Sequence, residues 1–197
     1  SDKLNELVGL LLKFSVDSSD SIRQAAVYGL GVFAASVSGE AFCLWAQQII
    51  EALQKAVSFP VNKSQKTHGH AKDNAIAALG RVLQHKSPYI DFQTLTGVWV
   101  NLLPLRFDKT EAKLMHDLFL DIAVENLHLV LGPNQERLTH IVAFLAEILE
   151  TRLLYKESEF KVKVVFSKIQ EKNPEALSQV WGTLTELQKK KISNLSS

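Results

Sequence analysis

The chain has 197 residues, and its 22 basic and 21 acidic side chains leave a formal net charge of +1. This balance excludes a strong field for nucleic acid or anionic lipid, and no uninterrupted run of about 18 apolar residues occurs. We therefore expect neither direct nucleic-acid binding nor membrane insertion. Cys43 is the only cysteine, which excludes a disulfide framework and a cluster of thiolate ligands.

The first helix pair is expected to begin near the first residue of the sequence. Apolar residues recur at helical spacing from Leu4 to Leu12 and predict a helix over about residues 2–16. Residues 17–20, Asp-Ser-Ser-Asp, interrupt it and offer caps to a second helix, which runs to about Ser36. Because no polar cap precedes Leu4, we expect the chain to be the C-terminal end of a longer array of helices.

The second pair repeats a sequence of the first. Residues 23–32 (RQAAVYGLGV) align without gaps with residues 72–81 (KDNAIAALGR), so that Gly31 and Gly80 correspond, 49 positions apart. A helix pair that recurs at about 40–50 residues is typical of a helical solenoid, which acts through its surface and curvature. The expected elements of this pair are a helix over 39–57, a polar loop over 58–69 and a helix over 71–85.

Two further pairs and a single terminal helix follow. Pro104 ends a short helix, Gly132-Pro133-Asn134 separates the third pair from the fourth, and Pro174 marks the start of the last helix. The composition predicts an all-α fold in one segment over residues 1–197. The four pairs span residues 2–36, 39–85, 91–130 and 134–171, and the terminal capping helix spans 174–191.

The first pair resembles a HEAT repeat. The motif consists of Asp17 in the turn, Ile22-Arg23 at the start of the second helix, the small pair Ala25-Ala26, and then Leu30-Gly31. The resemblance implies an all-α HEAT-repeat solenoid, a right-handed superhelix. It also implies that Asp17 and Arg23 take part in hydrogen-bonded ladders between repeats.

A longer ordered set of motifs is similar to the C-terminal repeats of the importin-β (karyopherin-β) superfamily, of the importin-five type. Besides the two repeated stretches, the set comprises residues 99–105 (WVNLLPL), 108–112 (DKTEA) and 130–134 (VLGPN). The resemblance implies a nuclear import receptor that shuttles between cytoplasm and nucleus through the nuclear pore. Its implied partners are cargo proteins, FG nucleoporins and Ran-GTP, the last bound mainly by N-terminal repeats outside this chain.

Second helices of solenoid pairs usually line the concave face, and their polar residues are the candidate protein-binding residues. We select Tyr28, Asn74, Arg81 and His116. Other positions expected to be exposed on these helices are Gln24, Asp73, Ala77, Gln84, Lys113, Asp117 and Asp121. Because the charges alternate in sign, no basic or acidic partner is favoured, and an ordinary solvated face is the alternative interpretation.

Other chemistry-bearing residues have structural interpretations. His68 and His70 are too few for a zinc site, which needs three or four convergent ligands, so we expect a loop there and no metal or cofactor. Cys43 is expected to be a buried thiol. The tryptophans are expected in the core between repeats, with walls of pockets for phenylalanine side chains as the alternative; they are Trp45, Trp99 and Trp181.

Two alternatives to a transport receptor stay open. One is another HEAT-repeat scaffold, such as a phosphatase regulatory subunit or a chromosome-organising protein. The other is an enzyme built on helices, which would need convergent titratable groups that the sequence does not provide, so we expect no catalysis. The uncovered face of the first helix, with Leu4, Leu7 and Leu11, also predicts end-to-end self-association.

Overall fold

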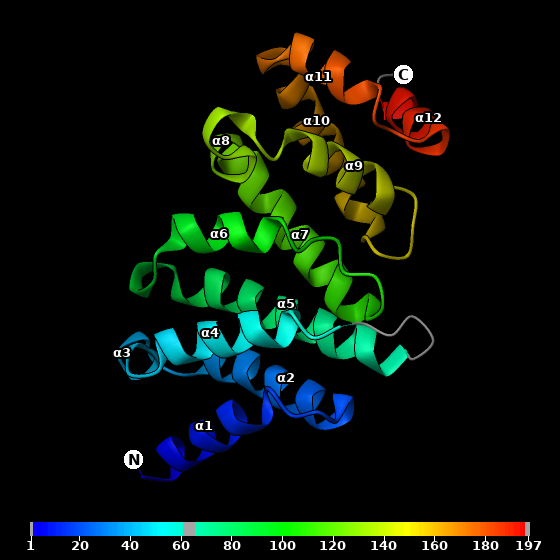
Figure 1. Ribbon diagram of the computed structural model, residues 1–197. Coiled ribbons are helices and arrows are strands. Elements are labelled where there is room, and N and C mark those ends of the chain that lie inside the picture. Colours follow the sequence, from blue (N-terminus) through cyan, green and yellow to red (C-terminus); the bar gives the residue numbers. More distant parts are fainter. Residues whose placement is uncertain (1, 61–65, 196–197) are drawn as a thin grey trace. The chain divides into compact units, whose positions relative to one another are not determined.

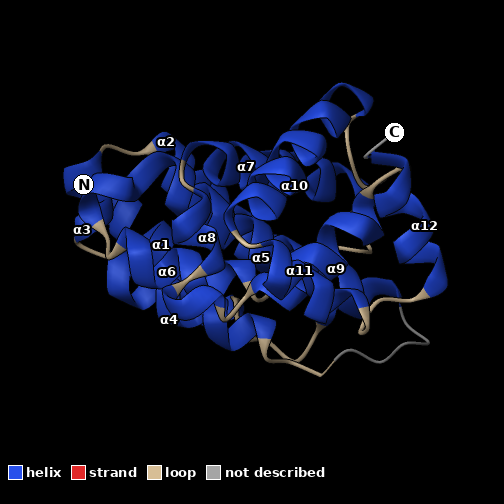
Figure 2. Cartoon of the chain, turned by 90° about the horizontal axis from the view of Figure 1, so that it is seen from above, coloured by secondary structure: helices blue, strands red, loops and turns tan. Residues whose placement is uncertain are grey.

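The computed structural model describes residues 2–60 and 66–195, and the regular elements in these ranges are helices (Figure 1). Figure 2 shows these helices joined by loops, with no strand in the part of the chain that is described. The prediction of an all-α fold is therefore confirmed. Positions 61–65 of the expected loop lie outside the described residues.

The chain divides into two compact units, which are described separately. Unit 1 comprises Ser1–Leu95 and Leu105–Ala112, and unit 2 comprises Thr96–Pro104 and Lys113–Ser197. Two helices contribute residues to both units: α6 (Phe92–Val100) and α7 (Lys109–Glu125).

Unit 1 contains the repeated stretch, which forms two neighbouring helices. The other elements of this unit are α1 (Asp2–Phe14), α2 (Asp20–Ser36), α3 (Gly39–Cys43), α4 (Ala46–Val57), α5 (Lys66–Lys86) and the 3-10 turn η1 (Ser87–Tyr89). Helix α5 packs along α2 and also against α4 (Figure 1). A Cβ added to Gly31 would lie 3.1 Å from the Cα of Ala78, so small residues let the two helices approach closely. Val27 and Leu30 of α2 and Leu79 of α5 are fully buried in this core.

Two helix boundaries in unit 1 differ from the prediction. The expected helix over 39–57 is interrupted at Trp45, whose φ and ψ of −128° and 0° are not helical. Helix α5 begins at Lys66 instead of Ala71, so part of the predicted loop is helical. A tertiary contact supports the first turns of α5, since His68 in these turns pairs with Asp20 of α2.

Unit 2 has its own core of aromatic and branched side chains. Its elements besides α6 and α7 are α8 (Leu127–Leu131), η2 (Pro133–Gln135), α9 (Leu138–Ile148), η3 (Lys156–Ser158), α10 (Glu159–Lys172), α11 (Pro174–Trp181) and α12 (Glu186–Leu195). Helix α10 packs against α11, and α9 packs against α12. The rings of Phe119 and Phe144 meet edge to face, with centroids 4.9 Å apart, and Val165 of α10 is also fully buried.

The helices of unit 2 are shorter than predicted. Asn126 interrupts the second helix expected in the pair over residues 91–130, and its Oδ1 accepts the backbone N–H of Leu129 at 3.1 Å. The fourth pair's first helix starts at Leu138 instead of Asn134, because Asn134 has a φ of +54°.

The prediction of a single terminal helix is wrong, because α11 and α12 are separate. Thr185 Oγ1 accepts the N–H of Gln188 at 3.2 Å, and Gln188 Oε1 accepts the N–H of Thr185 at 2.9 Å. This reciprocal pair is a capping box, and it starts a new helix within the predicted one.

Candidate protein-binding surface

A buried carboxylate on α5 organises the segment that leads into α7. Asp73 is 3% exposed, and its Oδ2 accepts the backbone N–H groups of Arg106 at 3.0 Å, Phe107 at 2.6 Å and Asp108 at 2.8 Å. Burial raises the pKa of Asp73, although the three hydrogen bonds act in the opposite direction. The expectation that Asp73 lies on the surface is therefore wrong.

Asn74 and Arg81 extend this connection within unit 1. Asn74 Nδ2 donates to Asp108 Oδ2 at 2.9 Å, and Arg81 Nη2 pairs with Glu111 Oε1 at 2.8 Å. Asp108 also caps α7, since its Oδ1 accepts the N–H of Glu111 at 3.2 Å. Asn74 is 4% exposed, so its expected place on an open face is wrong, and its amide connects two helices instead.

The ion pair between Arg81 and Glu111 is largely shielded from water. The two side chains are 15% and 8% exposed. Arg81 Nη1 and Glu111 Oε2 are buried and have no hydrogen-bond partner among the residues that the structure describes. The pair is therefore joined by a single charge-assisted hydrogen bond, which fixes the position of the guanidinium group.

Two exposed side chains of α2, one aromatic and one apolar, form a patch together with Arg81. Tyr28 and Val32 are one helical turn apart on α2 and are 46% and 42% exposed. The guanidinium carbon of Arg81 lies 5.7 Å from the centroid of the Tyr28 ring, within reach of a cation–π interaction. Tyr and Arg are enriched in protein interfaces, and we call Tyr28, Val32 and Arg81 the α2–α5 patch.

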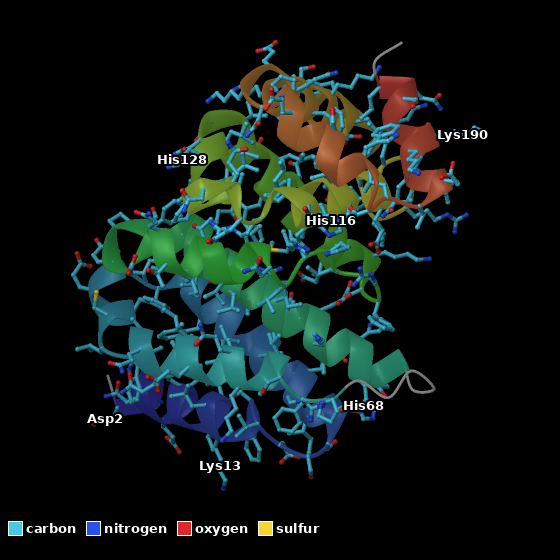
Figure 3. The ribbon with its side chains drawn as sticks, turned by 45° about the horizontal axis from the view of Figure 1, so that its top comes forward. Asp2, Lys13, His68, His116, His128 and Lys190 are labelled. Carbon is cyan, nitrogen blue, oxygen red and sulfur yellow. The ribbon has the colours of Figure 1, made fainter. Side chains whose placement is uncertain are left out.

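The fourth candidate residue, His116, belongs to unit 2 and is fully buried on α7 (labelled in Figure 3). Its Nδ1 lies 2.8 Å from the backbone oxygen of Leu153, so this nitrogen carries the proton. Its ring meets that of Phe144 edge to face, with centroids 5.2 Å apart. The expectation of an exposed His116 is therefore wrong, and the residue has a packing role.

Acidic residues of α7 are joined to α10 in unit 2. Lys161 Nζ contacts Asp117 Oδ1 at 2.8 Å and Asp121 Oδ1 at 2.6 Å, and Ser158 Oγ donates to Asp117. Burial lowers the pKa of Lys161, but the two carboxylates outweigh burial, and the net pKa is raised. Of the other positions expected on the surface, Ala77 is buried, Gln24 and Lys113 are half-buried, and Gln84 is exposed.

The residues that carry the HEAT resemblance make a polar link between α2 and α5. Arg23 pairs with Asp20 and donates to the backbone oxygen of Asp17 at 2.6 Å. Its guanidinium carbon lies 4.2 Å from the centroid of the Phe59 ring. Asp20 Oδ2 in turn contacts His68 Nε2 of α5 at 2.7 Å, so the Arg23–Asp20 pair reaches the next helix pair.

Basic side chains hold the C-terminal ends of several helices, a role that the sequence analysis missed. Lys86 donates to the oxygen of Val37 after α2 at 2.7 Å. Two further lysines act in the same way in unit 2, Lys168 on Val124 O and Lys191 on Leu149 O. Helix C-terminal carbonyls attract cations, but partners 40 or more positions away leave no local signal in the sequence.

The remaining predicted residues occupy mixed environments. Cys43 is exposed, so the prediction of a buried thiol is wrong. Trp99 is fully buried, as expected of a core residue, whereas Trp45 and Trp181 are half-buried. Leu44, beside Trp45, is 71% exposed.

Neither a metal site nor a membrane-spanning helix is found among the described residues. No group of three or more His, Cys, Asp or Glu side chains there could hold a metal ion. Among the same residues, the helices are too short or too polar to cross a membrane. No family model matches the chain.

Proposed function

We propose that the chain is a HEAT-repeat segment of a nuclear transport receptor of the importin-β type, which binds proteins and has no catalytic role. The observation that carries the proposal is the succession of polar links in unit 1. Asp20 of α2 reaches His68 of α5, and Asp73 and Arg81 of α5 reach the start of α7. Such links are expected when helix pairs stack one after another around a repeated core.

The proposed mechanism depends on shape. In a right-handed superhelix of stacked pairs, small changes at each contact between repeats add up to a large change in curvature. Cargo proteins and Ran-GTP would favour different curvatures, so that each weakens the binding of the other. FG nucleoporins would hold the receptor at the nuclear pore as it shuttles between cytoplasm and nucleus.

Within this proposal, the α2–α5 patch is the surface that contacts a protein partner. Of the four residues selected from the sequence, Tyr28 is exposed and Arg81 is held beneath its ring by Glu111, whereas Asn74 and His116 support the fold. A rigid aromatic side chain beside a fixed guanidinium group loses little conformational freedom on binding, which suits an interface centre.

The test measures binding of the chain, and of a longer protein containing it, to an FG-repeat peptide, to Ran-GTP and to cargo captured from a nuclear extract. We expect the longer protein to bind all three, and Tyr28→Ala to weaken cargo binding by about 10-fold. Phe160→Ala is the matched control, because Phe160 is an aromatic residue 61% exposed in unit 2.

If the longer protein binds neither FG peptide nor Ran-GTP but binds a phosphatase catalytic subunit or a chromosomal complex, the transport proposal fails and another HEAT-type scaffold takes its place. Equal losses of cargo binding in Tyr28→Ala and Phe160→Ala would remove the α2–α5 patch from the proposal.

A further inference from the structure

Helix α1 presents an apolar face that other helices of unit 1 leave open. Val8 is the buried residue of this helix, whereas Leu7 and Leu10 are 48% and 46% exposed. A groove of about 400 Å³ opens beside them, lined by Leu10 and Phe14 of α1 and by Ile22 of α2, which is 45% exposed. Exposed apolar surface of this extent on neighbouring helices is typical of an interaction site.

The open face has the spacing of a coiled-coil seam. Lys3, Leu7, Leu10 and Phe14 follow one another at intervals of four, three and four residues, which places Leu7 and Leu10 at consecutive core positions of a heptad. Leu11, on one flank of the seam, lies against Gly29 of α2, and the opposite flank carries the exposed Glu6 and Lys13, one heptad apart.

The order of these two charges is self-complementary in one orientation. When two identical helices pair antiparallel, the same flank of each helix meets, so that Glu6 lies beside Lys13 of the second copy and Lys13 beside its Glu6. The same orientation opposes the two helix dipoles. In a parallel pair Glu6 lies beside Leu11 of the second copy, and no charge pair forms.

We propose that the open face of α1 binds a second copy of this chain, with the two α1 helices antiparallel about a two-fold axis. Leu7 of each copy packs against Leu10 of the other, and two Glu6–Lys13 pairs flank this core. Asp2 and Lys13 mark the two ends of α1 in Figure 3. The interface is isologous, since each copy contributes the same residues. This proposal goes beyond the transport proposal and concerns the 197-residue chain itself, since in a longer array of helices a preceding pair would compete for the same face of α1.

Sedimentation equilibrium of the chain over a range of concentrations tests the pairing. Because the interface is small, we expect a monomer–dimer equilibrium with a dissociation constant on the order of 10⁻⁵ M. Leu7→Glu should raise that constant by at least about 30-fold, since it places a charge in the apolar seam of both copies. Leu44→Glu is the matched control, because Leu44 is an exposed leucine of the same unit outside the seam.

Charge reversal tests the orientation. Glu6→Lys and Lys13→Glu should each weaken the dimer by about 5-fold, and the double variant Glu6→Lys/Lys13→Glu should restore it, because both pairs are then reversed. Circular dichroism confirms that each variant keeps its helix content.

A second measurement does not depend on charge. In a Cys43→Ser background, a mixture of Leu7→Cys and Leu10→Cys chains should oxidise to mixed dimers faster than either chain forms its own dimer. A monomer at every concentration up to about 10⁻³ M, equal effects of Leu7→Glu and Leu44→Glu, or a double charge variant weaker than both single ones would overturn the proposal.

Discussion

Helices α2 and α5 carry the same ten-residue pattern but relate differently to their surroundings. In α5 the pattern contains Asp73 and Arg81, which are mostly buried and bonded to the segment that begins α7. In α2 the corresponding residues are Gln24, which is half-buried, and Val32, which is 42% exposed. The shared small and apolar residues thus build the contact between the helices, while a few polar positions decide which face is occupied by a neighbour.

The largest effect is expected at Asp73 and Gln24, the positions at which the ten-residue stretches of α5 and α2 differ most. Asp73→Ala removes the acceptor of three backbone N–H groups and should lower the free energy of unfolding of unit 1 by about 3 kcal/mol. Gln24→Ala, at the corresponding position of α2, should cost less than about 0.5 kcal/mol. Urea denaturation followed by Trp45 fluorescence measures both, with Trp99 and Trp181 replaced by Phe.

Equal losses for Asp73→Ala and Gln24→Ala would break the comparison, because they would mean that the polar link to α7 adds nothing to the shared core. The choice of Trp45 matters, since it lies in unit 1, whereas Trp99 and Trp181 lie in unit 2. A transition seen by Trp45 alone therefore reports the unit that contains both α2 and α5.

Two histidines of unit 2, one buried and one exposed, test the same difference between buried and exposed polar residues. His116→Ala should lower the free energy of unfolding by about 2 kcal/mol, because it leaves a void beside Phe144 and takes the donor from Leu153 O. His128 is exposed, as labelled in Figure 3, and His128→Ala should change the stability by less than about 0.5 kcal/mol. Thermal unfolding monitored through Trp99 distinguishes the two variants, and a His116→Ala protein as stable as His128→Ala would contradict the packing role.

A double-mutant cycle measures the link that α2 lacks. Arg81→Met and Glu111→Gln, singly and together, should give a coupling of about 1 kcal/mol, since both side chains are mostly shielded from water. The control cycle uses the pair of Lys189 and Glu186. It should give a coupling near zero, because the side chain of Glu186 is 89% exposed to solvent. Similar couplings in the two cycles would show that burial does not strengthen the α5–α7 pair.

The smallest expected effect is a pH dependence that Gln24, the residue of α2 corresponding to Asp73, cannot have. Because burial raises the pKa of Asp73 above 3.8, the folded chain holds this proton more tightly than the unfolded chain. The contribution of Asp73 to stability should therefore fall as the pH rises from 3.8 to the folded pKa, and stay constant above it. Asp73→Asn should remove this contribution from the pH dependence of denaturation, and a difference of the opposite sign between the unmodified chain and the variant would refute the assignment.

Apolar periodicity predicted much of the fold. The repeated stretch at residues 23–32 and 72–81 correctly indicated two helices, because small and apolar residues at a fixed register determine local structure and close packing together. The interruptions were harder to predict. Trp45 interrupts an apolar run that continues at helical spacing on both sides, whereas the Thr185 and Gln188 capping box was visible in the sequence.

The candidate site was predictable only in part. Tyr28 is exposed as expected, but Asn74 and His116 are buried against Asp108 and Leu153, residues 34 and 37 positions away. A polar residue on a helix gives the same local signal whether it faces water or a bonding partner on another helix. The exposure of Cys43 was also missed. The sequence predicted one continuous helix with Cys43 inside it, whereas α3 ends at Cys43 and leaves the thiol exposed.

The lysines that hold helix ends have a consequence for chemical labelling of the chain. Lys86 is 5% exposed, and its ammonium group is bound to the oxygen of Val37, whereas Lys190 is exposed on α12, as seen in Figure 3. An acylating reagent needs a free, deprotonated amine, so Lys190 should react well before Lys86. The order in which amines are modified thus becomes a footprint of helix docking, and loss of protection at Lys86 would reveal when the end of α2 comes away from α5.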